Sequence, residues 1–227
     1  MSTPAPKARA RARAGRPSRV SRPEIVAVAR RILAEDGLAA LSMRRVAKEL
    51  GVAPMTLYNH VEDKDDLLLG VIYEFASDWE RPQLPEQPKE RLIAVVVYMH
   101  DRLAERPWMV EVLLAGDLVG HYALWMTETI ISSAVACGLS TEAAVLAYRS
   151  LWHYVAGELM TAIAAERRSA SSDRPHYFAG LLAGLDPATH PTLAALGPGY
   201  LEITRGYDFA AGVRAFVDGL LSATHDG

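Results

Sequence analysis

The stretch GVAPMTLYNHVEDK, residues 51–64, gathers several reactive side chains within a few positions. It holds the phenol of Tyr58, the amide of Asn59, the imidazole of His60 and the amine of Lys64. A positioned histidine can act as a general acid or base, so a catalytic site is one hypothesis. The alternative is a short helix whose outward side chains contact a macromolecule. His60 has no carboxylate partner within reach along the sequence, which favours the alternative.

The residues around this stretch predict a helix-turn-helix. One helix follows Ser42 and ends at Gly51, and a second, barely two turns long, runs over about 54–60. A preceding helix opens with the capping box Ser21-Arg22-Pro23-Glu24. Apolar residues at helical spacing would pack the pair onto that helix. They are Leu41, Val46, Ala47, Leu50, Val52, Leu57 and Val61.

The side chains that this packing leaves outside suit a nucleic-acid duplex. They include cations, hydroxyls and an amide, which can bind phosphate oxygens or reach base edges. The predicted DNA-binding residues are Arg44, Arg45, Lys48, Pro54, Met55, Thr56, Tyr58, Asn59, His60 and Lys64. Pro54 and Met55 are placed to rest against a thymine methyl group. A solvated helix surface explains any single one of these residues equally well, but it explains the whole set poorly.

The charge distribution agrees with a DNA-binding N-terminal part. Residues 1–64 carry 13 Lys and Arg against 6 Asp and Glu, whereas residues 65–227 carry 11 against 21. Such a split predicts a basic module that meets a polyanion, joined to an acidic body that does not. Residues 1–20 are basic and rich in Pro, Ala and Ser, which predicts a disordered arm. The arm either contacts DNA or serves only solubility.

The rest of the chain predicts further helices and no strands, so the predicted fold class is all-α. RPQLPEQP, residues 81–88, is a break. Helices are expected over about 89–105, 122–137, 141–168, 191–196 and 208–223, with a polar loop at 169–175. A further short helix is expected after the break at Pro107, ending at about residue 114. We assign residues 1–20 to the arm, 21–66 to a three-helix helix-turn-helix domain, and 67–227 to a larger helical ligand-binding and dimerisation domain.

Several classes of protein are disfavoured. The lone Cys137 excludes an internal disulfide and suits a reducing cytoplasm, and no stretch is long and apolar enough to span a membrane. No G-x-S-x-G, P-loop, Rossmann or H-E-x-x-H motif is present, so an enzyme is not expected. The seven histidines form no i,i+3 or i,i+4 pair. We therefore predict no metal site and no cofactor.

The run AALSMRRVAKELGVAPMTLYNHVEDKDDLL, residues 39–68, resembles the DNA-binding domain of the TetR family of bacterial transcriptional regulators. The resemblance implies phosphate contacts for Thr56, Tyr58, His60 and Lys64, and a phosphate or base contact for Arg44. Ala53 stands where the family often has a polar helix cap. The closing segment 203–221 is similar, more loosely, to tetracycline-repressor-like ligand domains.

The resemblance also implies a homodimer that reads a pseudo-palindromic operator, with recognition helices in successive major grooves. The helices 141–168 and 208–223 of both copies would form the interface. Helix 141–168 carries an apolar stripe six turns long that calls for a packing partner. That partner is either the second copy or the chain's own core. The basic segment Arg9 to Arg22 would lie along a minor groove.

The acidic body has the material for an effector pocket, which needs apolar walls and a few placed polar groups. Core packing is the simpler explanation of any single one of these residues. The abundance of tryptophan favours a flat or aromatic effector. The predicted ligand-binding residues are Met99, His100, Trp108, Met109, Leu113, Tyr122, Trp125, Met126, Tyr148, Trp152, His153 and Glu158.

The sequence leads to three hypotheses about function. The first is a cytoplasmic, ligand-responsive repressor whose partners are operator DNA, a small effector and a second copy of the chain, with no membrane. In this hypothesis the helix that starts at residue 63 links the pocket to the DNA-binding head. The second is a DNA-binding regulator without a small effector, and the third is an enzyme. The operator sequence, the effector and the regulated genes are left open, as is activation instead of repression.

Overall fold

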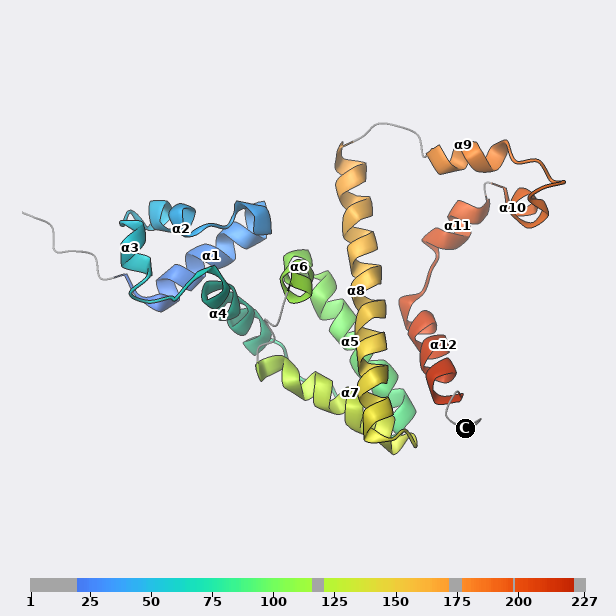
Figure 1. Ribbon diagram of the computed structural model, residues 1–227, viewed down its shortest axis with the longest axis horizontal. Coiled ribbons are helices and arrows are strands. Elements are labelled where there is room, and N and C mark those ends of the chain that lie inside the picture. Colours follow the sequence, from blue (N-terminus) through green and yellow to red (C-terminus); the bar gives the residue numbers. More distant parts are fainter. Residues whose placement is uncertain (1–19, 116–120, 172–176, 198, 223–227) are drawn as a thin grey trace, which may run out of the picture.

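The computed structural model describes residues 20–115, 121–171, 177–197 and 199–222. Every regular element of the described part is a helix and none is a strand, which confirms the predicted all-α fold (Figure 1). The predicted disordered arm, residues 1–20, lies outside the described residues except for Val20.

The N-terminal unit consists of α1 (Arg22–Asp36), the short 3-10 helix η1 (Leu38–Ala40), α2 (Met43–Leu50) and α3 (Pro54–Leu57). The capping box at the start of α1 is present, because Glu24 accepts a hydrogen bond from the Ser21 backbone N–H at 2.8 Å. Gly51 ends α2 in the left-handed conformation with φ 67°, which a residue with a Cβ adopts only at a cost.

Apolar side chains that recur at helical spacing hold this unit together. Val46, Ala47 and Leu57 are fully buried, as is Ile25 on α1. They share one core with Val61 in the turn after α3. Burial of this set fixes α2 and α3 against α1 and leaves their opposite faces in solvent, as the sequence predicted.

Helix α4 (Lys64–Ser77) joins this unit to the rest of the molecule. Asp63 caps it by accepting a hydrogen bond from the Asp66 backbone N–H at 2.8 Å. The Arg22 guanidinium binds both oxygens of the Asp66 carboxylate, at 2.7 and 2.9 Å, and donates to the His60 carbonyl at 2.9 Å. Arg22, counted with the basic arm in the sequence, therefore ties α1 to the turn before α4.

The larger unit is built from α5 (Pro88–Ala104), α6 (Pro107–Ala115), the short helix η2 (His121–Ala123), α7 (Leu124–Ala136) and α8 (Thr141–Ser171). Helix α5 packs against α7 and α8, and α6 also packs against α8. Figure 1 shows α8 as the long central helix of this unit.

The apolar stripe of α8 is buried inside the chain. Leu151 and Val155 are fully buried, and Leu159 and Ile163 are nearly so. The stripe therefore needs no second copy to cover it. Its apolar character is explained by the chain's own core and is no evidence for a dimer. The hydrophobic side chain that α8 leaves most exposed is Leu146, at 66%.

The chain ends in α9 (Tyr177–Ala183), α10 (Pro191–Leu196), α11 (Gly199–Arg205) and α12 (Phe209–Ser222). In Figure 1, α9, α10 and α11 lie on the opposite side of α8 from the N-terminal unit, while α12 packs on α5. Helices α9 and α11 were not predicted from the sequence. Helix α8 also runs three residues into the segment 169–175 that was expected to be a loop, because Ser and Ala in this segment do not stop a helix.

Candidate DNA-binding surface and ligand cavity

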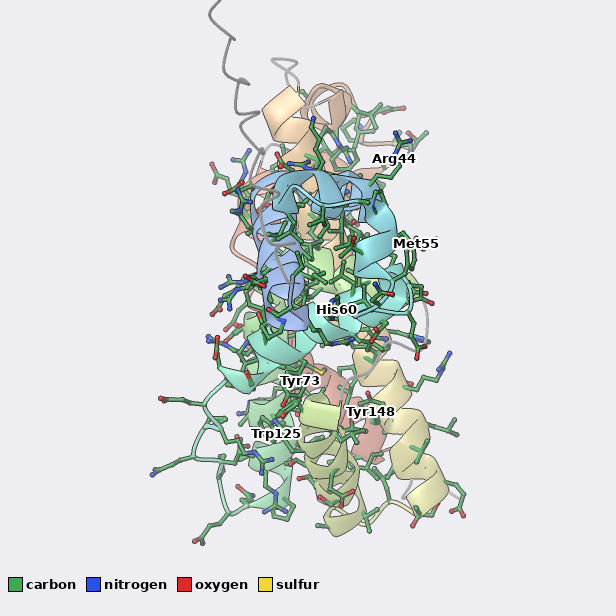
Figure 2. All side chains as sticks on the ribbon, turned by 90° about the vertical axis from the view of Figure 1, so that its left-hand side faces the viewer. Arg44, Met55, His60, Tyr73, Trp125 and Tyr148 are labelled. Atoms are coloured by element: carbon green, nitrogen blue, oxygen red, sulfur yellow. The ribbon has the colours of Figure 1, made fainter. Side chains whose placement is uncertain are left out.

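The predicted DNA-contacting side chains come from α2, from α3 and the turn after it, and from the first residue of α4, and seven of the ten are exposed. Figure 2, which views the molecule from the α3 end, shows Arg44, Met55 and His60 on this unit. Met55 is 74% exposed and Tyr58 is 49% exposed, although both are large and partly apolar. Large exposed side chains beside cations are typical of a surface that binds a partner. We call the ten predicted residues, taken together, the recognition face.

Helix α3 presents this face on a very short element. Regular helix covers Pro54–Leu57, and hydrogen-bonded turns continue it to His60, whose backbone N–H donates to the Leu57 carbonyl at 2.8 Å. Ala53 provides no side-chain cap, as the sequence indicated, and Pro54 at the first helical position supplies the required φ. Leu57 anchors the element in the core and thereby sets the direction of its neighbours.

The cations of the recognition face differ in their surroundings. Arg44 and Lys48 are exposed, and neither is ion-paired in the part of the chain that the structure describes. Arg45 is half-buried and bound to the carboxylates of Asp36 and Glu49. These hydrogen bonds raise the pKa of Arg45 and hold its side chain against the unit. Arg44 and Lys48 are thus the freer donors for phosphate oxygens.

His60 is exposed at the end of the α3 turn, and no described side chain is hydrogen-bonded to its imidazole. A general base needs a group that orients it and a pocket that holds a substrate. His60 has no such orienting group among the described residues, and it lines neither of the two cavities described in this structure. The arrangement favours contact with a polyanion over catalysis.

The larger unit encloses a cavity of about 380 Å³. Helices α4, α5, α6, α7 and α8 and the short helix η2 each contribute to its wall, which is mainly apolar. The predicted residues that line it are Met99, Met109, Leu113, Tyr122, Met126, Tyr148 and Trp152. The lining residues that the sequence analysis missed are Ile72, Ala76, Trp79, Leu103, Ala123, Thr127, Val145 and Arg149.

A few polar groups interrupt these apolar walls. The Thr127 hydroxyl donates to the Tyr148 hydroxyl at 3.2 Å, which links α7 to α8 at the cavity. Arg149 contributes a positive charge, and no Asp or Glu is among the described lining residues. An apolar pocket with a few hydroxyls and one cation suits a small aromatic or apolar ligand.

Three of the five predicted ligand residues that do not line the cavity are charged or titratable. His100 is hydrogen-bonded to Glu158 at 2.7 Å and stacks on Phe209 of α12, with ring centroids 3.8 Å apart. This contact ties α5, α8 and α12 together and takes both polar groups away from the cavity. His153 is exposed.

The other two are tryptophans that pack elsewhere. Trp125 lies 5.7 Å from the Tyr98 ring and beneath the Arg81 guanidinium. Trp108 is buried against Phe75, and its indole N–H has no hydrogen-bond partner among the described residues. A buried donor of this kind costs on the order of 1–3 kcal/mol.

Helix α4 belongs to both candidate sites. Its first residue, Lys64, is part of the recognition face, while Ile72 and Ala76 face the cavity. Tyr73 contacts Tyr122 edge-to-face at 4.3 Å, and its hydrogen bond raises the pKa of the Tyr122 hydroxyl. Figure 2 shows Tyr73 between the recognition face and the two residues Trp125 and Tyr148. Helix α4 therefore connects the wall of the cavity with the N-terminal unit.

Other reactive groups give no further site. Among the described residues, no cluster of three or more His, Cys, Asp and Glu side chains has an arrangement that could hold a metal ion. Burial raises the pKa of the free Cys137 thiol, which disfavours the reactive thiolate. No helix in the described part is long and apolar enough to cross a membrane.

Comparison with known families agrees with this geometry. Residues 25–71 match the family model described as bacterial regulatory proteins, tetR family. The chain is 29% identical to the HTH-type transcriptional repressor DrrR1 of Streptomyces coeruleorubidus, over 90% of this chain and 80% of that protein. Within a shorter stretch, 23% of this chain and 28% of the relative, it is 44% identical to the HTH-type transcriptional regulator SAB2452 of Staphylococcus aureus.

Solved structures share the fold over nearly the whole chain. The TetR family protein ActR of Streptomyces coelicolor, in complex with actinorhodin, has a TM-score of 0.73 and 25% identity, covering 90% of this chain and 96% of that chain. BioQ with its natural double-stranded DNA operator has a TM-score of 0.61 and 22% identity, and the match covers 89% of this chain and 99% of that chain. The proteins named are regulators and not enzymes, which agrees with the sequence-based expectation.

Proposed function

Since the chain belongs to the tetR family of bacterial transcriptional regulators, we propose that it is a ligand-responsive repressor. In this proposal two copies bind a pseudo-palindromic operator through the recognition face, and a small effector in the cavity releases them. DNA-binding transcriptional regulation follows from the family. The effector, the symmetry of the operator and the roles of individual residues are our proposals. The place of action would be the cytoplasm, where operator DNA lies.

One observation carries the proposal: α4 contributes Lys64, the last residue of the recognition face, at one end and a wall of the cavity at the other. A ligand that binds better to one position of α4 shifts the population toward it and changes the orientation of α3. Tyr122 and Tyr73 are the contact through which a displacement of η2 would act on α4.

The recognition face divides into two kinds of contact. Arg44, Lys48 and Lys64 would bind phosphates and hold the protein on any sequence, together with Tyr58. Pro54 and Met55 would touch base edges or thymine methyl groups and set the sequence preference. Thr56, Asn59 and His60 complete the face as hydrogen-bond donors or acceptors. Arg45, held by two carboxylates, would orient α2 more than it contacts DNA.

The effector is proposed to be small and mainly apolar or aromatic, because the cavity has apolar walls. Its volume of about 380 Å³ is sufficient for a ligand of modest size. ActR, a similar chain of the same fold, is known in complex with actinorhodin, which supports a ligand cavity here. The lining residues, not His100, His153 or Glu158, are the proposed ligand contacts.

The homodimer is proposed from the family resemblance and from surfaces that remain exposed. The α8 stripe is internal, so the partner would meet another face of α8, which includes Leu146, together with α12.

The proposed division into residues 21–66 and 67–227 places the boundary within α4, in keeping with the contribution of α4 to both the recognition face and the cavity. The homodimer can be tested separately from this boundary. Sedimentation at micromolar concentration should show a dimer, and a monomer would contradict this part of the proposal.

The decisive experiment is footprinting on the DNA beside the protein's own gene, followed by release with a compound panel. We expect a protected pseudo-palindrome and at least one flat apolar compound that both releases the DNA and raises the melting temperature by mass action. Protection without any such compound would favour the regulator that has no small effector. Absence of protection on any sequence would contradict DNA binding.

A further inference from the structure

A second cleft lies where the DNA-binding unit meets the larger unit. Its volume is about 760 Å³, and it is separate in the fold from the apolar cavity. Helix α1, the end of α4, the turn between α5 and α6, and the far end of α8 all contribute to it. We call it the hinge cleft; its charged and aromatic lining residues are Arg30, Arg31, Arg106, Arg167, Glu105, Phe75 and Trp108.

The hinge cleft carries an excess of positive charge. Its lining includes four arginines and a single carboxylate, and that carboxylate, of Glu105, is bound to Arg102 at 2.6 Å. Two of the arginines form ion pairs with carboxylates outside the cleft lining, Arg31 with Glu49 and Arg167 with Glu111. The remaining two, Arg30 and Arg106, are the source of the excess.

Arg30 and Arg106 lack close carboxylate partners. The nearest carboxylate oxygen to Arg30, on Asp78, is 4.0 Å away and belongs to a side chain that is 68% exposed. Arg106 donates to the backbone carbonyl of Glu105 and pairs with no carboxylate among the described residues. Solvent screening makes the Asp78 contact weak, so both guanidinium groups remain available to an anion.

An aromatic ring holds these two arginines in place. The Arg30 guanidinium carbon lies 4.3 Å from the centroid of the Phe75 ring, and that of Arg106 lies 5.1 Å from it. Trp108 packs on the same ring and has a buried indole N–H without an acceptor in the described part of the chain. Cations that pack on a shared ring lose less freedom when they bind a ligand.

From these groups we infer that the hinge cleft binds a small anion with two or more phosphate or carboxylate groups. Guanidinium forks match the oxygens of both groups and bind them in pairs. Most of the side-chain polar groups in the cleft are donors, so the ligand must supply acceptors. The ligand class differs from that of the apolar cavity, whose walls would not accept a multiply charged ion.

The position of the cleft gives such an anion a regulatory consequence. Arg30 belongs to the DNA-binding unit, whereas Arg106 and Arg167 belong to the larger unit. An anion that binds both sides stabilises one orientation of the DNA-binding unit relative to the body. This consequence rests on the proposed function, but binding of the anion does not.

Isothermal titration calorimetry of the full chain, with pyrophosphate and separately with citrate at constant ionic strength, tests the inference. We expect one site per chain for at least one of the two probes. The variant Arg30→Gln/Arg106→Gln should weaken that binding at least tenfold. The control Arg81→Gln/Arg205→Gln removes the same number of positive charges at two exposed positions, one between α4 and α5 and one on α11, and it should leave the affinity for the anion unchanged.

The two probes distinguish the sources of the anion, since a preference for pyrophosphate indicates phosphate esters and a preference for citrate indicates polycarboxylates. Absence of saturable binding to the wild-type chain overturns the inference. So does equal weakening in both double variants, because the loss would then follow from the net charge of the protein and not from the hinge cleft. Operator affinity, measured on the same samples without either probe, shows separately whether the proposed function holds.

Discussion

The recognition face and the apolar cavity are built in opposite ways. All ten residues of the recognition face come from positions 44–64, and their side chains are mostly in solvent. The cavity takes its walls from six elements between residues 72 and 152, and most of its lining side chains are buried or half-buried. A surface that contacts DNA is thus a local product of two short helices, whereas the cavity exists only after distant helices have packed.

The difference predicts different responses to mutation. Truncation on the recognition face should remove contacts with DNA and leave the fold intact, because little apolar area is lost. A change in the cavity wall should alter ligand binding and leave the DNA-binding surface as it is. Only residues on or beside α4 should affect both properties.

The largest effect is expected from removing two proposed phosphate contacts. The variant Tyr58→Ala/Lys64→Ala should lose on the order of 100-fold in operator affinity, or about 2.7 kcal/mol. Fluorescence anisotropy at several salt concentrations measures the operator affinity. The slope of log affinity against log salt should fall by about one for Lys64→Ala, since one released counterion is lost.

Glu128→Ala, at an exposed position on α7, is the control and should bind the operator as the wild type does. An unchanged affinity in the double variant would mean that the recognition face is assigned incorrectly.

A cavity variant comes next. Leu113→Trp fills part of the apolar cavity and should weaken effector binding at least tenfold, about 1.4 kcal/mol. Operator affinity should be retained, because α6 is not part of the recognition face. The measurement is the rise in melting temperature with an effector identified from the compound panel.

The matched change Leu124→Trp introduces the same ring at a position that is 53% exposed and does not line the cavity. It should leave the effector response intact. A full response in Leu113→Trp would place the effector elsewhere in the molecule.

The link between the two regions can be tested through Asp66. Its hydrogen bonds to Arg22 hold the pKa of the Asp66 carboxyl below its usual range. A carboxyl whose pKa is lowered by folding stabilises the protein above its unfolded pKa, about 3.9, and loses this contribution as the pH falls through the folded value. Asp66→Asn should therefore cost roughly 1 kcal/mol at pH 7, since the pair is partly exposed.

The difference between wild type and Asp66→Asn should shrink below about pH 4. Denaturant unfolding at pH 7 and near pH 3 measures it, and Asp65→Asn on the exposed side of the same helix is the control. A difference that stays constant with pH would show that the loss does not come from the Arg22 ion pair.

The smallest effect concerns base preference. Met55→Ala should change the operator affinity by only about 1 kcal/mol, but it should do so unequally across sequences. Comparison of thymine with uracil at single operator positions shows whether a methyl group is contacted. Equal weakening on every sequence would make Met55 a nonspecific contact.

Local signals predicted much of the DNA-binding unit. The capping box at Ser21, the glycine at position 51 and the burial of Leu57 all follow from short-range rules. Prediction was poorer for the larger unit. His100 and Glu158 looked like ligand groups because each is a polar residue on an apolar helix, but they bind each other across α5 and α8. Nothing in either helix alone reveals that pairing.

The stretch 51–64 by itself determined the helical turn, its outward polar side chains and the absence of a catalytic partner, because helix periodicity and capping act over a few residues. Only the tertiary structure decided that Arg22 ties α1 to α4, that the α8 stripe is internal, and that Arg30 and Arg106 meet over Phe75. These contacts join residues separated by dozens of positions. Their existence depends on how whole helices pack, which no short segment specifies.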